Sequence, residues 1–250
     1  MKQRPAWLLH SMRMVALLAL CLACLQAVFA ARIALMAVVD PQSTTFQRSE
    51  AWRLMVDKHQ LAWSQDWVGS EQISVHLQRA VIASEDAGFA EHVGVDWSAL
   101  EKAWGRNQQA QARAERQTQR APGRKVTPKV VGGSTITQQL AKNLFLSGER
   151  TVLRKAQELL ITLMLEALLG KQRLLEIYLN NVEWGEGVFG AQAAARHYFR
   201  VDAARLGPAQ AARLAVMLPA PKRFEQRPNS DYVVNRAATI EARMGAVELP

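Results

Sequence analysis

The sequence is poor in cysteine, histidine, aromatic residues, glycine and proline. Its only cysteines, Cys21 and Cys24, share one apolar run near the N-terminus, so the rest of the chain has neither a disulfide nor a thiolate metal site. The five histidines are scattered and never stand at ligand spacing, which argues against a zinc enzyme. Aromatic residues make up only 7% of the chain, while alanine and leucine abound. This composition favours helix over strand.

Acidic residues are also few, but the resulting net charge of +9 is unevenly distributed. It comes almost entirely from residues 1–13 and 102–129, and the remainder is close to neutral. A uniformly basic surface is therefore not indicated, and no nucleic-acid partner is expected. With 49% hydrophobic residues, a chain of 250 residues can form a sizeable core, which excludes a wholly disordered or fibrous protein.

The longest uncharged stretch, residues 14–31, is followed after Arg32 by a further apolar segment that ends at Val39. About 20 apolar residues cross a bilayer, and an arginine near the end of a span can reach the headgroups. Residues 14–39 are therefore predicted to be a transmembrane anchor. The basic tail of residues 1–13 predicts a cytoplasmic N-terminus, with residues 40–250 on the outer side of the membrane.

Two other interpretations of this segment remain open. The sequence Val28-Phe29-Ala30 fits the cleavage site of a signal peptide, and Leu22-Ala23-Cys24 fits a lipoprotein signal less well. The uncleaved anchor is preferred because apolar residues continue beyond Ala30. All three interpretations export the main domain.

Residues 105–130 form a basic insert that is rich in Gln, Arg and Ala. We expect a mobile surface loop or a frayed helix there. Its cations either form a solvated face or contact anionic lipid headgroups.

Elsewhere the hydrophobic pattern has the helical period, and convincing alternating strands are few. A buried helix is expected over residues 149–169, with an apolar stretch too short to cross a membrane. Further helices are expected over residues 171–180, 193–198 and 208–218. The domain is therefore predicted to be mainly α.

Three segments carry candidate chemistry, and the first is the acidic pair Glu85-Asp86, which follows an apolar helix. A carboxylate where a helix ends at the edge of a core is a plausible general base, because partial burial raises its pKa. Taken by itself, a solvated acidic pair is the commoner explanation.

The second segment covers residues 132–143. Thr135 and Gln138 have capping-box spacing, which predicts that a helix begins here. A helix N-terminus preceded by two glycines offers free N–H groups to an anion, and Lys142 would add a full charge. A well-capped surface helix explains the pattern equally well.

The third segment contains Arg150, Arg154 and Lys155, followed by Glu158. Such cations suit a diphosphate, because guanidinium groups bind phosphate oxygens bidentately. An ordinary helical ion pair between Arg154 and Glu158, worth about 0.3–0.5 kcal/mol, is the simpler alternative.

The GxGxxG pattern at residues 185–190 follows a helix, so we interpret it as a helix–helix turn and not as a dinucleotide site.

Together and in this order, these segments resemble the peptidoglycan glycosyltransferase family over about residues 70–225, and its monofunctional, single-pass type in particular. Residues 132–143 are the most specific match. The other matching residues are Glu85, Asp86, Phe89, His92, Gly94, Arg154, Lys155, Glu158, Glu176, residues 178–181, Gly185, Gly190, residues 193–195, Tyr198, Phe199, Leu214 and residues 218–221.

The resemblance implies a mainly α, lysozyme-like domain in the periplasm, behind one transmembrane helix in the bacterial inner membrane. It implies that lipid II is polymerised into glycan strands by attack of a sugar 4-hydroxyl on an anomeric carbon, with inversion and departure of undecaprenyl diphosphate. No cofactor is required, and a divalent cation, Mg²⁺ or Mn²⁺, is optional. The implied partners are lipid II, the growing glycan strand and the membrane, with other cell-wall synthesis or division proteins as a further option.

By the same resemblance, Glu85 corresponds to the general base, and Glu158 to a second essential carboxylate that holds the cations or a divalent metal. Since diphosphate is a good leaving group, cations replace the second acid that inverting hydrolases need. The residues expected to bind substrate or diphosphate are Asp86, Phe89, His92, Ser134, Thr135, Gln138, Gln139, Lys142, Asn143, Arg150, Arg154 and Lys155, with Lys102 as a further cation.

Two other functions remain as alternatives. A lysozyme-like lytic enzyme would also use one glutamate in an α fold, but it has no need of cations aimed at a diphosphate. A non-enzymatic membrane scaffold would make Glu85 dispensable.

We predict that the protein does not react with β-lactams. None of its serines is followed three residues later by lysine, the nucleophile pattern of penicillin-binding transpeptidases. A fluorescent penicillin should therefore leave the purified protein unlabelled on a denaturing gel. Stoichiometric covalent labelling would contradict this expectation.

Overall fold

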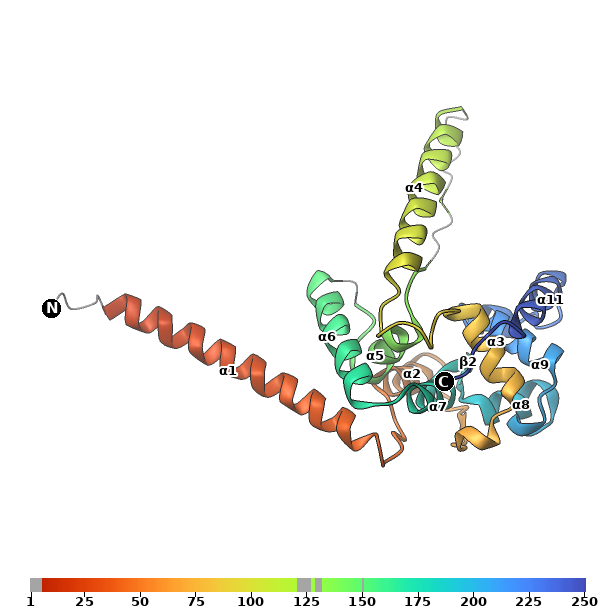
Figure 1. The fold of residues 1–250 in the computed structure, drawn as a ribbon, viewed down its shortest axis with the longest axis horizontal. Coiled ribbons are helices and arrows are strands. Elements are labelled where there is room, and N and C mark those ends of the chain that lie inside the picture. The colour runs from red at the N-terminus through yellow and green to blue at the C-terminus, as the bar shows by residue number, and fades with distance from the viewer. Residues whose placement is uncertain (1–5, 121–126, 129–131, 150) are drawn as a thin grey trace.

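The computed structural model describes residues 6–120, 127–128, 132–149 and 151–250. This part of the chain is built almost entirely of helices, so the prediction of a mainly α fold is confirmed (Figure 1). The helices are α1 Ala6–Leu35, α2 Thr45–Asp57, α3 Val75–Glu85, α4 Trp97–Arg120, α5 Ile136–Phe145, α6 Val152–Leu168, α7 Lys171–Asn181, α8 Ala191–Phe199, α9 Pro208–Met217, α10 Pro221–Glu225 and α11 Asp231–Met244. The other elements are the short strands β1 Ser64–Gln65, β2 Glu183–Gly185 and β3 Val188–Phe189 and the 3₁₀ turns η1 Ser70–Gln72 and η2 Ala203–Arg205.

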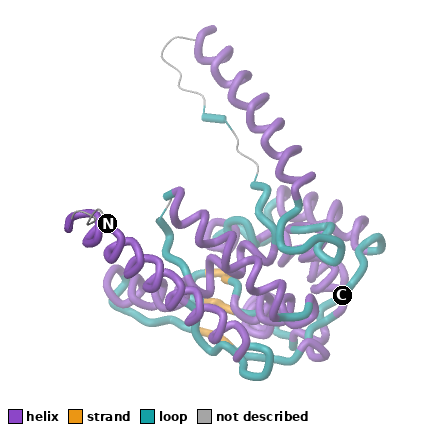
Figure 2. The backbone as a smooth tube through the Cα atoms, turned by 60° about the vertical axis from the view of Figure 1, so that its left-hand side comes forward, coloured by secondary structure: helices purple, strands orange, loops and turns teal. Residues whose placement is uncertain are grey.

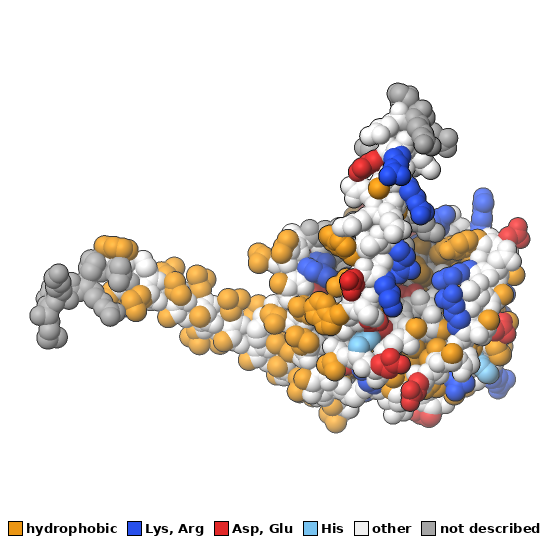
Figure 3. Space-filling model, turned by 45° about the horizontal axis from the view of Figure 1, so that its top comes forward, with side chains coloured by type: hydrophobic (Ala, Val, Ile, Leu, Met, Phe, Trp, Pro, Cys, Tyr) orange, Lys and Arg blue, Asp and Glu red, His pale blue; other side chains and the backbone are white. Residues whose placement is uncertain are grey.

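The N-terminal helix α1 extends away from the globular part of the molecule, and most of its length carries exposed apolar side chains (Figures 1 and 3). Between Leu9 and Leu35 it is long and apolar enough to cross a membrane. The helix ends before Val39, where the anchor was predicted to end, because the chain turns after Leu35. Its apolar character therefore fits a membrane anchor.

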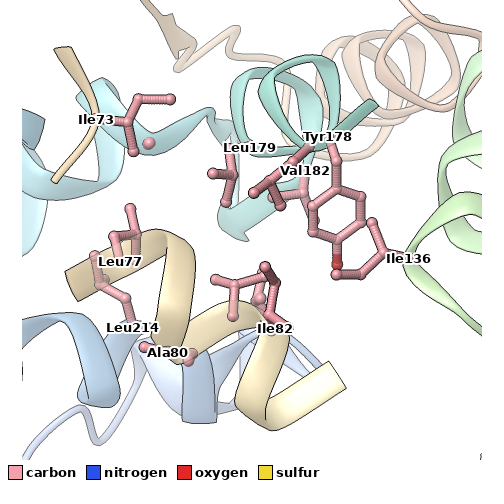
Figure 4. Close-up of a cluster of buried hydrophobic side chains, with 14 of the residues drawn as sticks. Ile73, Leu77, Ala80, Ile82, Ile136, Tyr178, Leu179, Val182 and Leu214 are labelled. Carbon is pink, nitrogen blue, oxygen red and sulfur yellow. The ribbon is translucent and has the colours of Figure 1, made fainter. Parts of the chain in front are cut away.

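The core is assembled around α3, which packs against α9 and α11, while α5 packs against α6 and α7. In Figure 4, Leu77 and Ile82 of α3 lie among side chains of the neighbouring helices, with Leu214 of α9 beside them. All three side chains are fully buried. Burying one such side chain contributes about 1.5–3 kcal/mol. This packing holds the C-terminal end of α3, which carries Glu85, against the start of α5.

The segment at residues 185–190 differs from the prediction of a helix–helix turn. It forms an antiparallel hairpin of β2 and β3, and β1 joins β3 in parallel (Figure 2). Gly187 has φ +73° and its carbonyl accepts a hydrogen bond from Ser64 N at 2.8 Å. A side chain at Gly187 would collide with the Ala62 carbonyl, so glycine permits the close approach of the two segments.

Of the two structures predicted for the basic insert, a loop or a helix, its described part up to Arg120 has the helix. Residues 105–120 are not a loop but continue α4, which projects from the globular part (Figure 1). Ala, Gln, Arg and Glu are good helix formers, which explains the continuous helix. Four exposed cations, Lys102, Arg106, Arg113 and Arg116, lie along this helix (Figure 3). Of the remaining insert, residues 121–126 and 129–130 lie outside the described residues.

We predict that Gly190→Ala lowers the free energy of unfolding by about 1–3 kcal/mol. Gly190 has φ +83°, and a side chain there would lie 2.7 Å from the Asn180 carbonyl oxygen. The control is Gly245→Ala, because Gly245 has φ −66° and open space around it. Thermal unfolding of the two variants in the same detergent measures the difference, and equal melting temperatures would count against the proposed strain.

Candidate active site

A cavity of about 670 Å³ opens between the end of α3, the start of α5, the first turns of α6 and the junction of α9 and α10. Nine of the predicted site residues line it: Glu85, Ser134, Gln138, Gln139, Lys142, Asn143, Arg154, Lys155 and Glu158. The three sequence segments with candidate chemistry therefore meet at one site.

Glu85 is the last residue of α3, and its side chain is half-buried at the cavity wall. Burial raises the pKa of this carboxyl, the hydrogen bond from Gln139 opposes the rise, and the neighbouring Asp86 adds to it. Gln139 Nε2 donates to Glu85 Oε2 at 3.0 Å. The site thus contains a carboxylate whose proton affinity is higher than that of an ordinary glutamate, as a general base requires.

Tyr178 fixes the orientation of the Gln139 amide. The Tyr178 hydroxyl donates to Gln139 Oε1 at 3.0 Å, so the amide Nε2 is directed at Glu85. Complete burial and the nearby Glu85 and Asp86 raise the pKa of Tyr178 well above its usual value, which keeps the hydroxyl protonated as a donor. The sequence contained Tyr178 only as a match to the family pattern, and nothing in its local spacing indicated this role.

Asp86 lies behind the cavity and connects the ends of two helices. Its buried carboxylate accepts a hydrogen bond from Ile136 N at 3.0 Å and lies 2.8 Å from His92 Nε2. Phe89 is fully buried, with Lys171 Nζ 4.5 Å from its ring centroid. Asp86, Phe89 and His92 are therefore placed in the supporting wall, outside the lining of the cavity.

Thr135 also belongs to this supporting wall. It caps α5 with the predicted capping box, and its hydroxyl donates to the Gly94 carbonyl oxygen at 2.6 Å. The capping box and Asp86 occupy three N–H groups at the start of α5, those of Thr135, Ile136 and Gln138. The prediction that these groups are free for an anion is therefore wrong, because protein oxygens already accept from them.

The cationic side of the cavity is organised around Glu158, which is 3% exposed. Its Oε2 lies 2.7 Å from Arg154 Nη1, and its Oε1 contacts Lys155 Nζ. Arg154 Nε is buried and has no hydrogen-bond partner among the described residues. A guanidinium held by one carboxylate and retaining an unused donor is suited to bind an anion.

Lys142 brings a third cation to the cavity from α5. Partial burial lowers the pKa of its ammonium group, and Glu158 opposes this effect. Lys142 forms no ion pair with a described acidic residue, so its charge is available to a ligand.

Two further cations were predicted for the site, Lys102 and Arg150. Lys102 is exposed on α4 and does not line it. Arg150 lies outside the described residues. A divalent cation does not fit Glu158 well, since both of its oxygens contact cationic side chains and no group of three or more potential ligands occurs within the described ranges.

Sequence reasoning missed the apolar part of the cavity lining, which is formed by Phe46, Leu146, Leu218 and Pro219. Phe46 lies on α2, far from every predicted motif. Leu218 and Pro219 belong to a matched segment, and the proline that ends α9 was the one available signal for a wall at this point.

The arrangement defines an enzyme class: one carboxylate of raised pKa and a cationic cluster share a cavity in a mainly helical domain, as expected for sugar transfer from a diphosphate-linked donor. Residues 55–245 match the family described as Transglycosylase. The chain belongs to this family. Membership also confirms the predicted lysozyme-like fold class.

Similar proteins cover most of this chain. It is 51% identical to a biosynthetic peptidoglycan transglycosylase of Paraburkholderia phytofirmans over 225 residues, which are 90% of this chain and 87% of that protein. A protein of the same name from Burkholderia lata is 52% identical over 225 residues, which cover 90% of this chain and 85% of that protein.

A cluster of charged residues connects α2, β2 and α10. Lys222 Nζ of α10 contacts Glu50 of α2 and lies 3.4 Å from Glu183 Oε1. Burial raises the pKa of Glu183 to about 7, Lys222 opposes the rise, and Glu50 adds to it. This cluster therefore contains a carboxyl that changes its charge near neutral pH.

We predict that Glu183→Gln stabilises the protein above pH 7 by about 1–3 kcal/mol. The pKa of Glu183 is higher in the folded state, about 7, than its ordinary value of 4.5, so its favourable contribution is complete at low pH and is lost as the pH rises through 7. The variant should unfold with a flatter dependence of melting temperature on pH between 5 and 8. The control is Glu241→Gln, an exposed glutamate of α11, and matching slopes for the wild type and Glu183→Gln would exclude this linkage.

Proposed function

We propose that this enzyme polymerises lipid II into peptidoglycan glycan strands, with Glu85 as general base and undecaprenyl diphosphate as leaving group. The observation that carries the proposal is the meeting of Glu85 with Lys142, Arg154 and Lys155 in one cavity. Family membership and relatives named biosynthetic peptidoglycan transglycosylases support glycan polymerisation over the lytic alternative.

In the proposed reaction, the acceptor hydroxyl oxygen forms a bond to the anomeric carbon of the growing strand. Its proton passes to the Glu85 carboxylate, and the bond from the anomeric carbon to the diphosphate oxygen breaks with its electron pair. Negative charge then builds up on the diphosphate, next to the cationic side of the cavity. Cations held in place beforehand stabilise that charge without reorganisation during the reaction.

The two carboxylates in the cavity have different roles in this proposal. Glu85 has no cation as a direct partner among the described residues, and burial raises its pKa, as a base requires. Glu158 is paired with Arg154 and Lys155 and therefore positions them. We propose no step through a divalent cation and no other cofactor, and turnover measured with chelator and with added Mg²⁺ or Mn²⁺ tests this.

For the location of the protein, we propose that α1 crosses the bacterial inner membrane with the basic N-terminus in the cytoplasm. The globular domain then lies in the periplasm, where the growing strand and any cell-wall synthesis or division partners would be met. The apolar surface of α1 between Leu9 and Leu35 supports its role as a membrane anchor. Protease protection in spheroplasts tests the orientation.

The proposed function is tested by incubating the full chain in detergent with labelled lipid II. Polymer that a muramidase digests to the repeating unit is the expected product. Release of soluble muropeptides from purified sacculi, without polymer from lipid II, would favour the lytic alternative.

We predict that Glu85→Gln reduces turnover by at least about 100-fold, because the amide cannot accept the hydroxyl proton. The control is Glu91→Gln, an exposed carboxylate six residues further on, which should retain wild-type turnover. If Glu85→Gln kept more than about a tenth of the wild-type turnover, Glu85 would lower the activation free energy by less than about 1.4 kcal/mol. That contribution is too small for a general base.

The pH dependence of turnover should be bell-shaped and narrow. Glu85 must be deprotonated, and its pKa is raised, so the acid limb should lie at higher pH than for an ordinary glutamate. Lys142 must be protonated, and its pKa is lowered, so the alkaline limb should lie at lower pH than for an ordinary lysine. Initial rates at saturating lipid II measure both limbs, and an acid limb at the ordinary glutamate value would be inconsistent with the assignment of Glu85.

We predict that Lys142→Ala reduces turnover at saturating substrate by at least about 100-fold, the loss expected for one preorganised electrostatic contact. Lys142 is a cleaner test than Arg154, because removal of Arg154 also deprives the buried Glu158 of a partner. The control is Lys58→Ala, at the end of α2. Weaker binding with unchanged saturated turnover would show that Lys142 only anchors the ground state.

A further inference from the structure

The last turns of α1 are part of the globular fold as well as of the candidate membrane span. Ile33 is fully buried, and the rings of Phe29 and Phe145 meet edge to face with their centroids 5.4 Å apart. The Arg32 guanidinium lies 5.1 Å from the Phe145 ring centroid. The helix therefore docks on the end of α5, one turn beyond Lys142.

A pair of glutamine side chains connects α1 to α6. Gln26 Nε2 donates to Gln157 Oε1 at 2.9 Å, and Gln157 Nε2 donates to Gln26 Oε1 at 3.0 Å. Both side chains are half-buried. The two amides therefore satisfy each other reciprocally, and the loss of either one leaves the other with unpaired polar groups.

Gln157 immediately precedes Glu158 on α6. Consecutive residues of a helix point about 100° apart, so the same turn can face α1 with one side chain and the cavity with the next. Arg154 and Lys155, which contact Glu158, lie within one turn of Gln157. A shift of α6 relative to α1 would therefore move the three charged groups that α6 brings to the cavity, Arg154, Lys155 and Glu158.

A substrate with a polyprenyl tail keeps its diphosphate close to the membrane surface. The cations must meet that diphosphate at the same height, and misplacement by about 1 Å can cost about 100-fold in rate. An anchor joined to the domain only by a flexible segment would not fix this height. The pair formed by Gln26 and Gln157 can fix this height, because it connects α1 directly to α6 next to Arg154, Lys155 and Glu158.

We propose that Gln26 and Gln157 form a positioning pair, which holds the cationic cluster of α6 at the height of the membrane-borne diphosphate. The inference rests on the proposed function, since it concerns the same leaving group. It extends that function by giving the anchor helix a part in the geometry of the site, and Gln26 and Gln157 themselves need not touch the substrate.

The test uses the full chain reconstituted in vesicles that contain labelled lipid II. The variants are Gln26→Leu, Gln157→Leu and the double variant, each with turnover expressed per folded protein. The control is Ser11→Leu, which removes a polar group from the same helix. The Ser11 side chain is exposed, and its hydroxyl donates to the Trp7 carbonyl of the same helix at 3.0 Å.

Each single variant should lower kcat at least about fivefold with KM within about twofold of wild type. The double variant should be no worse than either single variant, whereas independent effects would multiply to about 25-fold. Ser11→Leu should match the wild type. The split between kcat and KM identifies positioning, because a defect in capture of substrate from the membrane would raise KM instead.

Wild-type kcat in both single variants, a rise of KM alone, or multiplying losses in the double variant would each overturn the positioning pair. These results leave the proposed function intact, because they are ratios to a wild type that polymerises lipid II. Failure of the wild type to form polymer would remove the proposed function and this inference together.

Discussion

The buried carboxylate of Asp86 accepts a hydrogen bond from Ile136 N–H and contacts His92, and the site takes its shape from these contacts. Asp86 follows Glu85 at the end of α3, and Ile136 opens α5, which carries Gln139 on its first turn. One carboxylate therefore links Glu85, the proposed general base, to the helix that carries its hydrogen-bond donor Gln139. A buried carboxylate is tolerated only when its oxygens have such partners, so the connection is also a condition of folding.

Glu85 and Glu158 are two carboxylates of the same cavity, but they have different neighbours. Burial with only an amide donor raises the pKa of Glu85, whereas Glu158 lies between Arg154 and Lys155. The first arrangement favours uptake of a proton, and in the second the carboxylate contacts two cations at once. These different surroundings support the separate roles that we propose for the two residues, a general base and a holder of cations.

The anchor helix and the globular domain overlap, because the last turns of α1 pack into the domain. Ile33 belongs to the core, and the segment after α1 is tied to α7, because Arg173 donates to the Met36 carbonyl oxygen at 2.9 Å and to Asp40 Oδ1 at 2.7 Å. Hydropathy describes the anchor as a run of apolar residues up to Val39. Packing divides that run into an exposed apolar part that is long enough to enter a membrane and a docked part that belongs to the domain.

The sequence by itself determined the helical class, the capping box at Thr135 and the pairing of Arg154 with Glu158, because these depend on residues three or four positions apart. Only the tertiary structure decided that Asp86 accepts a hydrogen bond from an N–H group of α5, fifty positions away, and that Phe46 lines the cavity. Such contacts follow from the path of the whole chain. Local periodicity contains no record of that path, so it could indicate which groups carry the chemistry but not which of them meet.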